Sequence, residues 1–199
     1  MRAGLPDRIT DDLLLARAGS GDEAAFLLLY ERHRTAIFRF AYRLSGSVEL
    51  AEDITHDCFV SLIKHPERYN PERAMLRTYL FAAARNLALK YFRASGRESA
   101  LDDLVDEPPV PPREEPLRQL LEAELAAKVQ EAVAKLPPLQ REALILFEYE
   151  GLPLSEIAMV TGSDVGAVKS RLHRARESMR NRLAPYLNSY SEIVTLGKA

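Results

Sequence analysis

The sequence of 199 residues contains a single cysteine and no tryptophan. Cys58 alone cannot form an intramolecular disulfide, and the chain has no Cys-x-x-Cys motif or Cys/His cluster of the kind that binds zinc. The sequence has no run of about 18 apolar residues, the length needed to cross a membrane. Its first residues lack the apolar core of a signal peptide. We therefore expect a cytoplasmic protein with no metal, no cofactor and no direct membrane insertion.

Alternation of apolar and polar residues, the pattern of half-buried strands, is also scarce. Alanine, leucine, arginine and glutamate dominate the composition, and these residues favour helices. Hydrophobic residues make up 47% of the chain, which is enough to bury a core. Composition and length together predict an all-α protein of one or two domains.

The net charge of −2 conceals a separation of charge along the chain. Residues 67–97 carry seven basic and two acidic side chains, a net of +5, whereas residues 96–116 carry seven acidic and two basic ones, a net of −5. The acidic stretch also contains five prolines, a composition typical of a flexible linker. The sequence therefore predicts two small helical domains, 10–95 and 117–184, joined by the linker 96–116 and followed by a tail, 185–199, without an assigned role.

Four helices are expected in the first domain. They lie at residues 11–18, from a start within 20–23 to residue 45, at 48–65 and at 76–94. Ser20 and Glu23 have the spacing of a capping box at the start of the second helix. His33 lies on the apolar face of that helix, where a packed histidine is expected. The third helix has an acidic outer face, which alone would indicate a solvated surface.

The fourth helix places an aromatic ring, an amide and two cations on one face, at Tyr79, Asn86, Lys90 and Arg93. Such side chains can hold unstacked bases beside a phosphate backbone. A core tyrosine next to a solvated basic face fits the same pattern.

The stretch 164–182 has the strongest pattern in the chain. Six basic and two acidic side chains give it a net charge of +4, an electrostatic footprint typical of a surface that binds a polyanion. Its apolar residues form one helical stripe, at Val165, Val168, Leu172, Ala175 and Met179.

A short helix at residues 155–161 precedes this stretch, with Ser155 as the expected N-cap and Gly162 as its end. Ser163 or Asp164 would cap the basic helix. A short helix, a turn with glycine and a basic helix form a helix-turn-helix, whose second helix enters the DNA major groove. Base edges would be contacted by Ala167, Ser170, Arg171 and Arg174, and phosphates by Lys169, His173 and Arg176. A charge-rich helix packed on a bundle is the alternative.

These residues resemble those of bacterial RNA polymerase sigma factors of the extracytoplasmic function (ECF) type, group 4 of the sigma-70 family. The motif AEDITHDCF at 51–59 and the segment LRTYLFAAARNLALKYFR at 76–93 look like parts of sigma region 2. The segment LPPLQREALILFEYEGLPLSEIAMVTGSDVGAVKSRLHRARESMR at 136–180 looks like region 4. The resemblance covers residues 11–183, and the linker is too short for the additional domain of larger sigma factors.

The resemblance implies a subunit without catalytic residues that binds the β′ and β subunits of core RNA polymerase and recognises promoter DNA. It implies polymerase contacts at Asp53, His56, Asp57 and Phe59. It implies contacts with the downstream (−10) promoter element at Tyr79, Asn86, Lys90 and Arg93. It implies contacts with the upstream (−35) element at Ala167, Lys169, Ser170, Arg171, Arg174 and Arg176. An anti-sigma factor is a further expected partner.

Two other functions can be weighed against this one. A stand-alone helix-turn-helix regulator would need a ligand pocket or a dimerisation face in residues 10–95, and it would leave the faces of the third and fourth helices without a role. His33, His56-Asp57 and Asp102 are similar in order to the ligands of metal-dependent phosphohydrolases. Metal ligands must converge, and these residues fall on an apolar face, on a polar face and in the linker.

Overall fold

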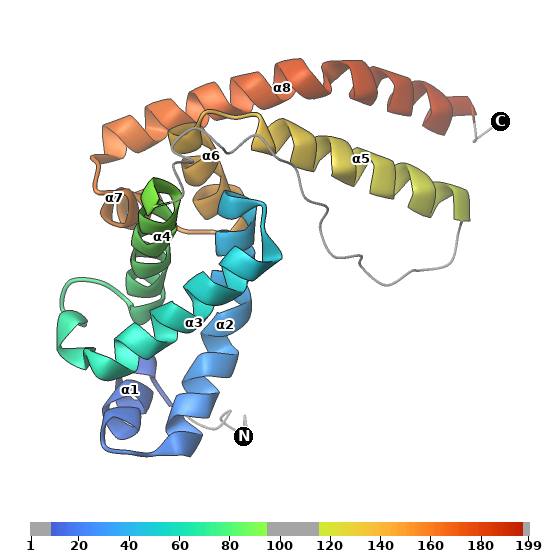
Figure 1. Cartoon of the computed structure of the whole chain (residues 1–199). Coiled ribbons are helices and arrows are strands. Elements are labelled where there is room, and N and C mark those ends of the chain that lie inside the picture. The colour runs from blue at the N-terminus through green and yellow to red at the C-terminus, as the bar shows by residue number, and fades with distance from the viewer. Residues whose placement is uncertain (1–8, 95–115, 197–199) are drawn as a thin grey trace, which may run out of the picture.

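The computed structural model describes residues 9–94 and 116–196, with side chains described for 9–94 and 124–186. Within these residues every regular element is a helix, which confirms the predicted all-α fold (Figure 1). The predicted linker lies outside the described residues except for Pro116, which begins a helix.

The first group of helices surrounds a core of aromatic and aliphatic side chains. Its elements are α1 (Asp11–Gly19), α2 (Glu23–Ser45), α3 (Val48–Lys64), the short turn η1 (Pro66–Arg68) and α4 (Leu76–Ala94). The long helix α2 packs against α1, α3 and α4. Phe40 of α2 and Phe81 of α4 meet edge to face, with ring centroids 5.2 Å apart, and Ile54 and Leu62 of α3 are buried with them.

The predicted capping box at the start of α2 is wrong. Asp22 is the N-cap, and its carboxylate accepts a hydrogen bond from the Ala25 amide at 3.0 Å. Ser20 instead ends α1, where its hydroxyl donates to the Ala16 carbonyl at 2.9 Å. The Arg17 guanidinium lies 2.6 Å from the Asp22 carboxylate. This ion pair and the hydrogen bond from the Ala25 amide both favour aspartate as the cap.

The second group lies along one long helix. Its elements are α5 (Pro116–Ala134), α6 (Pro138–Leu144), the π-helical turn η2 (Ile145–Tyr149), α7 (Leu154–Thr161) and α8 (Val165–Leu196). In Figure 1, α8 runs across the group, with α5 beside its C-terminal half and α6 and α7 near its start. Ile145, Leu146, Val168 and Leu172 are buried between these elements.

The helix that begins as α6 changes geometry at η2. The Glu150 amide donates to the Ile145 carbonyl at 3.1 Å, five residues back, which is the hydrogen bond of a π turn. Gly151 follows with φ at 65°, a conformation that glycine adopts without strain. A π turn changes the direction in which the side chains near its end point. Here those side chains are Tyr149 and Glu150.

The basic helix is longer than predicted, because α8 continues through Pro185 to Leu196. Proline removes a backbone donor inside a helix and normally ends it. Here α5 packs along α8, and the Lys128 ammonium of α5 lies 5.2 Å from the centre of the Tyr186 ring. Tertiary contacts of this kind support a helix that its local sequence would interrupt.

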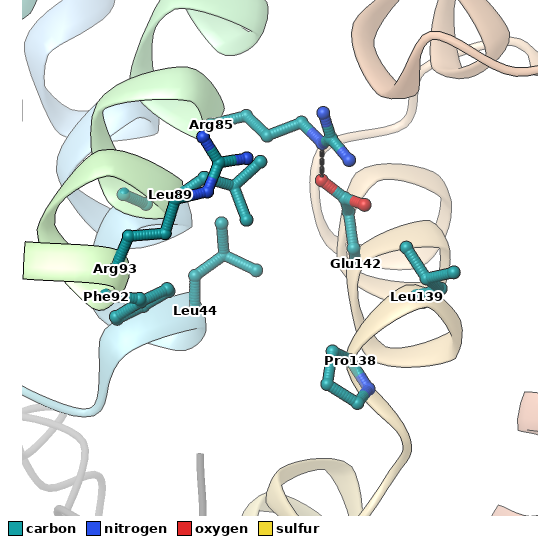
Figure 2. A pocket seen from close by; sticks show the side chains of 9 residues that line it. Leu44, Arg85, Leu89, Phe92, Arg93, Pro138, Leu139 and Glu142 are labelled. Atoms are coloured by element: carbon teal, nitrogen blue, oxygen red, sulfur yellow. Dashed lines mark hydrogen bonds and ion pairs between the residues drawn. The ribbon is translucent and has the colours of Figure 1, made fainter. Parts of the chain in front are cut away.

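The two groups are in contact. The helix α4 packs against α7, and α2 packs against η2 (Figure 1). Glu142 of α6 forms an ion pair with Arg85 of α4 (Figure 2). The Glu150 carboxylate lies 3.6 Å from Arg43 of α2.

Candidate nucleic-acid and polymerase interfaces

The predicted helix-turn-helix is present. Gly162 ends α7 in the left-handed conformation, with φ at 61°, and α7 packs on α8. Asp164 caps α8, since its carboxylate accepts a hydrogen bond from the Ala167 amide at 2.8 Å. That bond lowers the pKa of Asp164. The predicted N-cap Ser155 is wrong: α7 begins at Leu154, and Pro153 stands at the cap without a side-chain hydrogen bond.

The start of α8 presents cations and a hydroxyl to solvent. Lys169, Ser170 and Arg174 are exposed, while Ala167 and Arg171 are half-buried. The Arg171 guanidinium donates to the Ser163 hydroxyl at 3.2 Å, a contact that fixes it against the turn. Exposed donors on the second helix of this motif are placed to meet base edges and phosphates.

Arg176 differs from the other predicted residues of α8. Its guanidinium lies 2.7 Å from the Glu148 carboxylate and 5.0 Å from the centre of the Phe147 ring, so it contacts η2. Its charge is therefore partly compensated within the protein.

The residues predicted to contact DNA from α4 differ in exposure. Asn86, Lys90 and Arg93 are exposed, and Tyr79 is half-buried at the start of the same helix. Burial raises the pKa of the Tyr79 hydroxyl. Arg93 also lines a cavity between α4 and α6, together with Arg85 and Glu142 (Figure 2).

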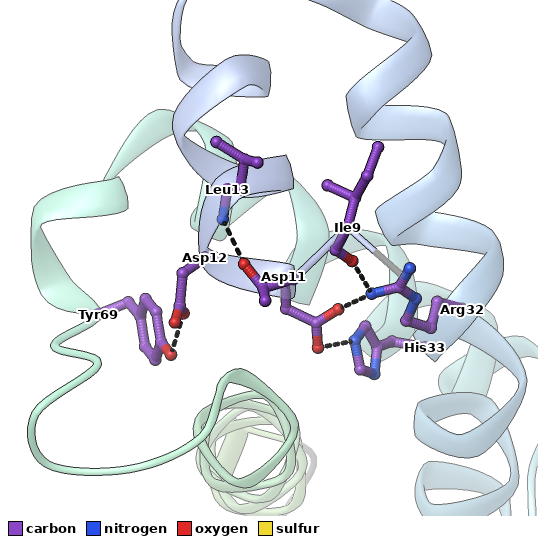
Figure 3. A network of polar contacts seen from close by, with 8 residues as sticks. Ile9, Asp11, Asp12, Leu13, Arg32, His33 and Tyr69 are labelled. Carbon is purple, nitrogen blue, oxygen red and sulfur yellow. Dashed lines mark hydrogen bonds and ion pairs between the residues drawn. The ribbon is translucent and has the colours of Figure 1, made fainter. Parts of the chain in front are cut away.

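Tyr69 is a further aromatic residue at this site that the sequence analysis did not identify. It follows η1, and its ring meets the Tyr79 ring edge to face, with centroids 5.5 Å apart. The Tyr69 hydroxyl donates to the Asp12 carboxylate at 2.7 Å (Figure 3). Burial and the neighbouring acids Asp12 and Asp11 raise its pKa. Helical periodicity could not have revealed it, because Tyr69 lies in a loop.

Asp11 joins this loop region to α2. Its carboxylate accepts from the Arg32 guanidinium and lies 2.7 Å from His33 Nε2 (Figure 3). The prediction that His33 is packed is confirmed, since the residue is buried. The first turn of α1 therefore contacts α2 on one side and Tyr69 on the other.

The predicted polymerase-contacting residues fall into three classes of exposure. Asp53 and His56 are exposed on α3. Asp57 is half-buried and accepts a hydrogen bond from the Tyr91 hydroxyl at 3.1 Å. Phe59 is buried in the core and meets the Tyr30 ring at 4.9 Å, so it supports the surface from inside.

No group of three or more potential metal ligands converges in the part of the chain that the structure describes. Of the residues weighed as phosphohydrolase ligands, His33 is bonded to Asp11, and Asp102 lies outside the described residues. Among the described helices none combines the length and hydropathy needed to cross a membrane.

Comparison with known families matches both groups of helices. Residues 29–98 match the family model for Sigma-70 region 2, and residues 126–179 match that for Sigma-70, region 4. The first match contains the predicted faces of α3 and α4, and the second contains the helix-turn-helix.

Relatives with curated names agree with these matches. The ECF RNA polymerase sigma-E factor of Escherichia coli K12 is 31% identical over 194 residues, which cover 92% of this chain and 99% of that protein. The ECF RNA polymerase sigma factor SigE of Mycolicibacterium smegmatis is 34% identical over 173 residues, 84% of this chain and 66% of that protein.

Two solved structures are similar in fold. The sigma factor RpoE of Bartonella quintana, in complex with the anti-sigma factor NepR, gives a TM-score of 0.63 at 26% identity and covers 82% of this chain and 97% of that one. CnrH in complex with the cytosolic domain of CnrY gives the same TM-score and identity, with coverage of 88% and 97%.

Proposed function

We propose that this chain, which belongs to the extracytoplasmic function (ECF) family of RNA polymerase sigma factors, binds core RNA polymerase, directs it to promoters and assists strand opening. The observation that carries the proposal is the pair of exposed cationic helix faces on α4 and α8, one in each matched sigma region. Two modest DNA contacts joined through a common partner gain from effective concentration. Such a subunit supplies no catalytic group and acts in the cytoplasm, where polymerase and promoters are found.

The start of α8 is the proposed reader of the −35 element. A helix of this motif places its first exposed residues in the major groove. Arg174 can donate two hydrogen bonds to one guanine, and such a pair discriminates against other bases by roughly 1–3 kcal/mol. Lys169 and Ser170 are exposed beside it, and Ala167 and Arg171 complete this surface near the turn.

The face of α4 is the proposed reader of the −10 element. Strand opening requires bases to leave the stack, which costs a few kcal/mol. Stacking of an unpaired base on an aromatic ring returns roughly 1–3 kcal/mol. Tyr79 supplies a half-buried ring, and the exposed Lys90 and Arg93 on the same helix can contact the backbone of the separated strand.

The acidic face of α3 is the proposed polymerase contact. Asp53 and His56 are exposed there, and Asp57 is held beside them by Tyr91. Phe59 contributes by packing beneath this face rather than by direct contact. On this proposal residues 10–95 form the polymerase- and −10-binding domain, and residues 117–184 form the −35-binding domain.

Regulation by an anti-sigma factor is part of the proposal. One structure with a similar fold is of a sigma factor in complex with an anti-sigma factor, and another is of CnrH in complex with the cytosolic domain of CnrY. The alternative of a stand-alone regulator is not favoured, because the first group of helices itself matches a sigma region.

The test is run-off transcription with purified core polymerase over a fragmented library of the host genome. Discrete transcripts that require this protein, and that share upstream and downstream motifs at fixed spacing, are the expected result. The absence of transcripts together with the absence of a complex with core polymerase would contradict the proposal. Asp53→Arg should weaken that complex, whereas Glu31→Arg, a matched change on the exposed side of α2, should not.

A further inference from the structure

Met75 is the most exposed large hydrophobic residue among those that the structure describes, with 71% of its surface accessible. It lies at the end of the loop of residues 69–75, directly before α4, and its neighbour Leu76 is only 2% exposed. Isolated apolar side chains are common on protein surfaces and need no explanation by themselves. The place of Met75 in the backbone, however, makes it unusual.

Met75 stands at the N-cap of α4. Its carbonyl accepts a hydrogen bond from the Tyr79 amide at 3.1 Å, and Leu76 is the first residue of the helix. An N-cap normally supplies a side-chain oxygen that accepts from the free amides of the first turn. Four other helices of the chain have such caps, at Thr10, Asp22, Ser47 and Asp164. A thioether accepts hydrogen bonds only weakly, so methionine at this position lowers the stability of the helix.

The loop that carries Met75 has defined turns. The Asn70 side chain accepts a hydrogen bond from the Glu72 amide at 2.8 Å, and the Asn70 carbonyl accepts one from the Arg73 amide at 3.1 Å. At one end the Tyr69 hydroxyl donates to α1, and at the other end the chain enters α4. Met75 is therefore an exposed apolar side chain on an ordered loop.

The same loop leads to the proposed reader of the −10 element. It begins at Tyr69 and enters α4, whose first turn contains Tyr79, and the rings of these two tyrosines meet edge to face. Met75 lies one helical turn before Tyr79, as the hydrogen bond between their backbones shows. An apolar side chain thus stands at the end of α4 that carries the aromatic rings.

The charge of the loop does not favour a contact with phosphate. Residues 66–75 expose two arginines, Arg68 and Arg73, and two glutamates, Glu67 and Glu72, so the charges cancel. Phosphates are bound by positive charge, whereas apolar side chains contact bases. Apolar side chains, methionine among them, can enter between neighbouring bases and partly unstack them.

A protein partner is the other class of molecule that could cover Met75. Surfaces that dock proteins are contiguous apolar patches of several hundred Å². Among residues 65–94, all of which the structure describes, Met75 is the only exposed large hydrophobic side chain. One methionine is too small to form such a patch, but it is large enough to separate two stacked bases.

We propose that Met75 is a wedge residue, which enters the base stack of the −10 element and helps to separate its strands. The inference rests on the proposed function, because that function identifies α4 as the reader of this element. Met75 acts on bases that are still stacked, whereas Tyr79 receives a base that has left the duplex. The missing capping oxygen is the cost in stability of placing an apolar side chain there, a local conflict of the kind found at functional sites.

The test makes use of the N-cap position, because stability and strand opening should change in opposite directions. Met75→Ser removes the wedge and supplies a capping oxygen. Its melting temperature should rise by about 2–4 °C, whereas its rate of strand opening should fall about tenfold. Met75→Leu keeps an apolar side chain of similar volume and should match the unaltered protein in both measurements. Met75→Ala, which removes the wedge without adding a cap, should open strands as slowly as Met75→Ser.

Strand opening is measured in the complex with core polymerase, on a duplex promoter found by run-off transcription. A fluorescent adenine analogue in the −10 element reports the unstacking of its bases. A template already open across this element is the control, and Met75→Ser should transcribe it as well as the unaltered protein does. A photoreactive amino acid in place of Met75 should crosslink to bases of the −10 element.

An unchanged rate of strand opening by Met75→Ser would overturn the wedge. An equal loss on the open template, or crosslinks from position 75 to polymerase, would also overturn it and would indicate a protein contact. If the unaltered protein and Met75→Leu open the promoter and Met75→Ser does so equally well, only the role of Met75 is refuted. If the unaltered protein forms no complex with polymerase, the proposed function fails, and the wedge fails with it.

Discussion

The two proposed DNA-reading faces differ in what lies beside their cations. On α8, Lys169 and Arg174 accompany a serine hydroxyl, on a helix whose start is fixed by the Asp164 cap. On α4, Lys90 and Arg93 accompany Tyr79, whose ring contacts Tyr69. Donors and charge without rings suit an intact duplex, whereas rings beside charge suit a strand whose bases have been separated. We therefore propose that α8 recognises double-stranded DNA and that α4 takes part in strand opening.

The largest expected effect comes from removing the ring on α4. Tyr79→Ala should lower transcription from duplex promoters about 10- to 100-fold, because stacking on an aromatic side chain contributes roughly 1–3 kcal/mol per base. Run-off transcription on duplex and on pre-opened templates measures it. Tyr79→Phe, which keeps the ring, should retain most of the activity. Equal loss on both templates would show that the ring acts through the stability of the fold instead of strand opening.

The next effect in size should come from α8. Arg174→Ala should lower transcription about tenfold on promoters that depend on the −35 element, since one paired contact with guanine contributes roughly 1–3 kcal/mol. Arg182→Ala, an exposed arginine farther along the same helix, is the control. Transcription from matched templates with and without the upstream element distinguishes the effect of Arg174→Ala from that of Arg182→Ala. A loss that is the same on both templates would remove Arg174 from sequence recognition.

A smaller effect is expected from the hydrogen bond that holds Tyr69. Tyr69→Phe removes the hydroxyl that donates to Asp12 but keeps the ring. A bond of this kind contributes about 1 kcal/mol, so open-complex formation should fall about fivefold on duplex templates. Asp12→Asn retains an acceptor and should have less effect. The measurement is the rate of base unstacking, followed with a fluorescent adenine analogue in the −10 element. An unchanged rate in Tyr69→Phe would show that the Tyr69 hydroxyl takes no part in the strand opening proposed for Tyr79.

The smallest effect concerns salt dependence on α8. A cation that contacts phosphate adds about one unit to the slope of log affinity against log salt concentration. Lys169→Ala should reduce that slope by about one unit, whereas Arg176→Ala should reduce it less, because Arg176 is paired with Glu148. Fluorescence anisotropy of the polymerase complex on labelled promoter DNA, at several salt concentrations, provides the slopes. Equal reductions would mean that the pair with Glu148 breaks when DNA binds.

Much of the fold could be predicted from the sequence because its helices have clear periodicity and clear ends. The prediction of residues 76–94 coincides with α4, and Gly162 ends α7 as expected. The errors arose where several local signals competed. Ser20 and Asp22 both suit an N-cap, and the ion pair of Asp22 with Arg17 decides between them. Pro185 predicts the end of a helix, yet packing on α5 outweighs it.

The candidate site was predictable where it lies on helices and was missed where it depends on tertiary contacts. Helical spacing places Asn86, Lys90 and Arg174 on outward faces, and they are exposed in the structure. Their assignment to DNA contacts comes from the resemblance to sigma factors and stays a prediction. Tyr69 lies in a loop, and its relation to Tyr79 and Asp12 exists only after α1 has packed. The partners of Glu142 and Glu150 are likewise far away in the chain, so no local pattern could identify them as buried.

Site-specific crosslinking tests the central claim most directly. A photoreactive amino acid is placed at Asn86 of α4 or at Ser170 of α8, both of which are exposed, and the complex with core polymerase is irradiated on a labelled promoter. Crosslinks from position 86 to the −10 element and from position 170 to the −35 element are the predicted result. Crosslinks from both positions to the same element, or in the reverse order, would contradict the assignment of the two faces.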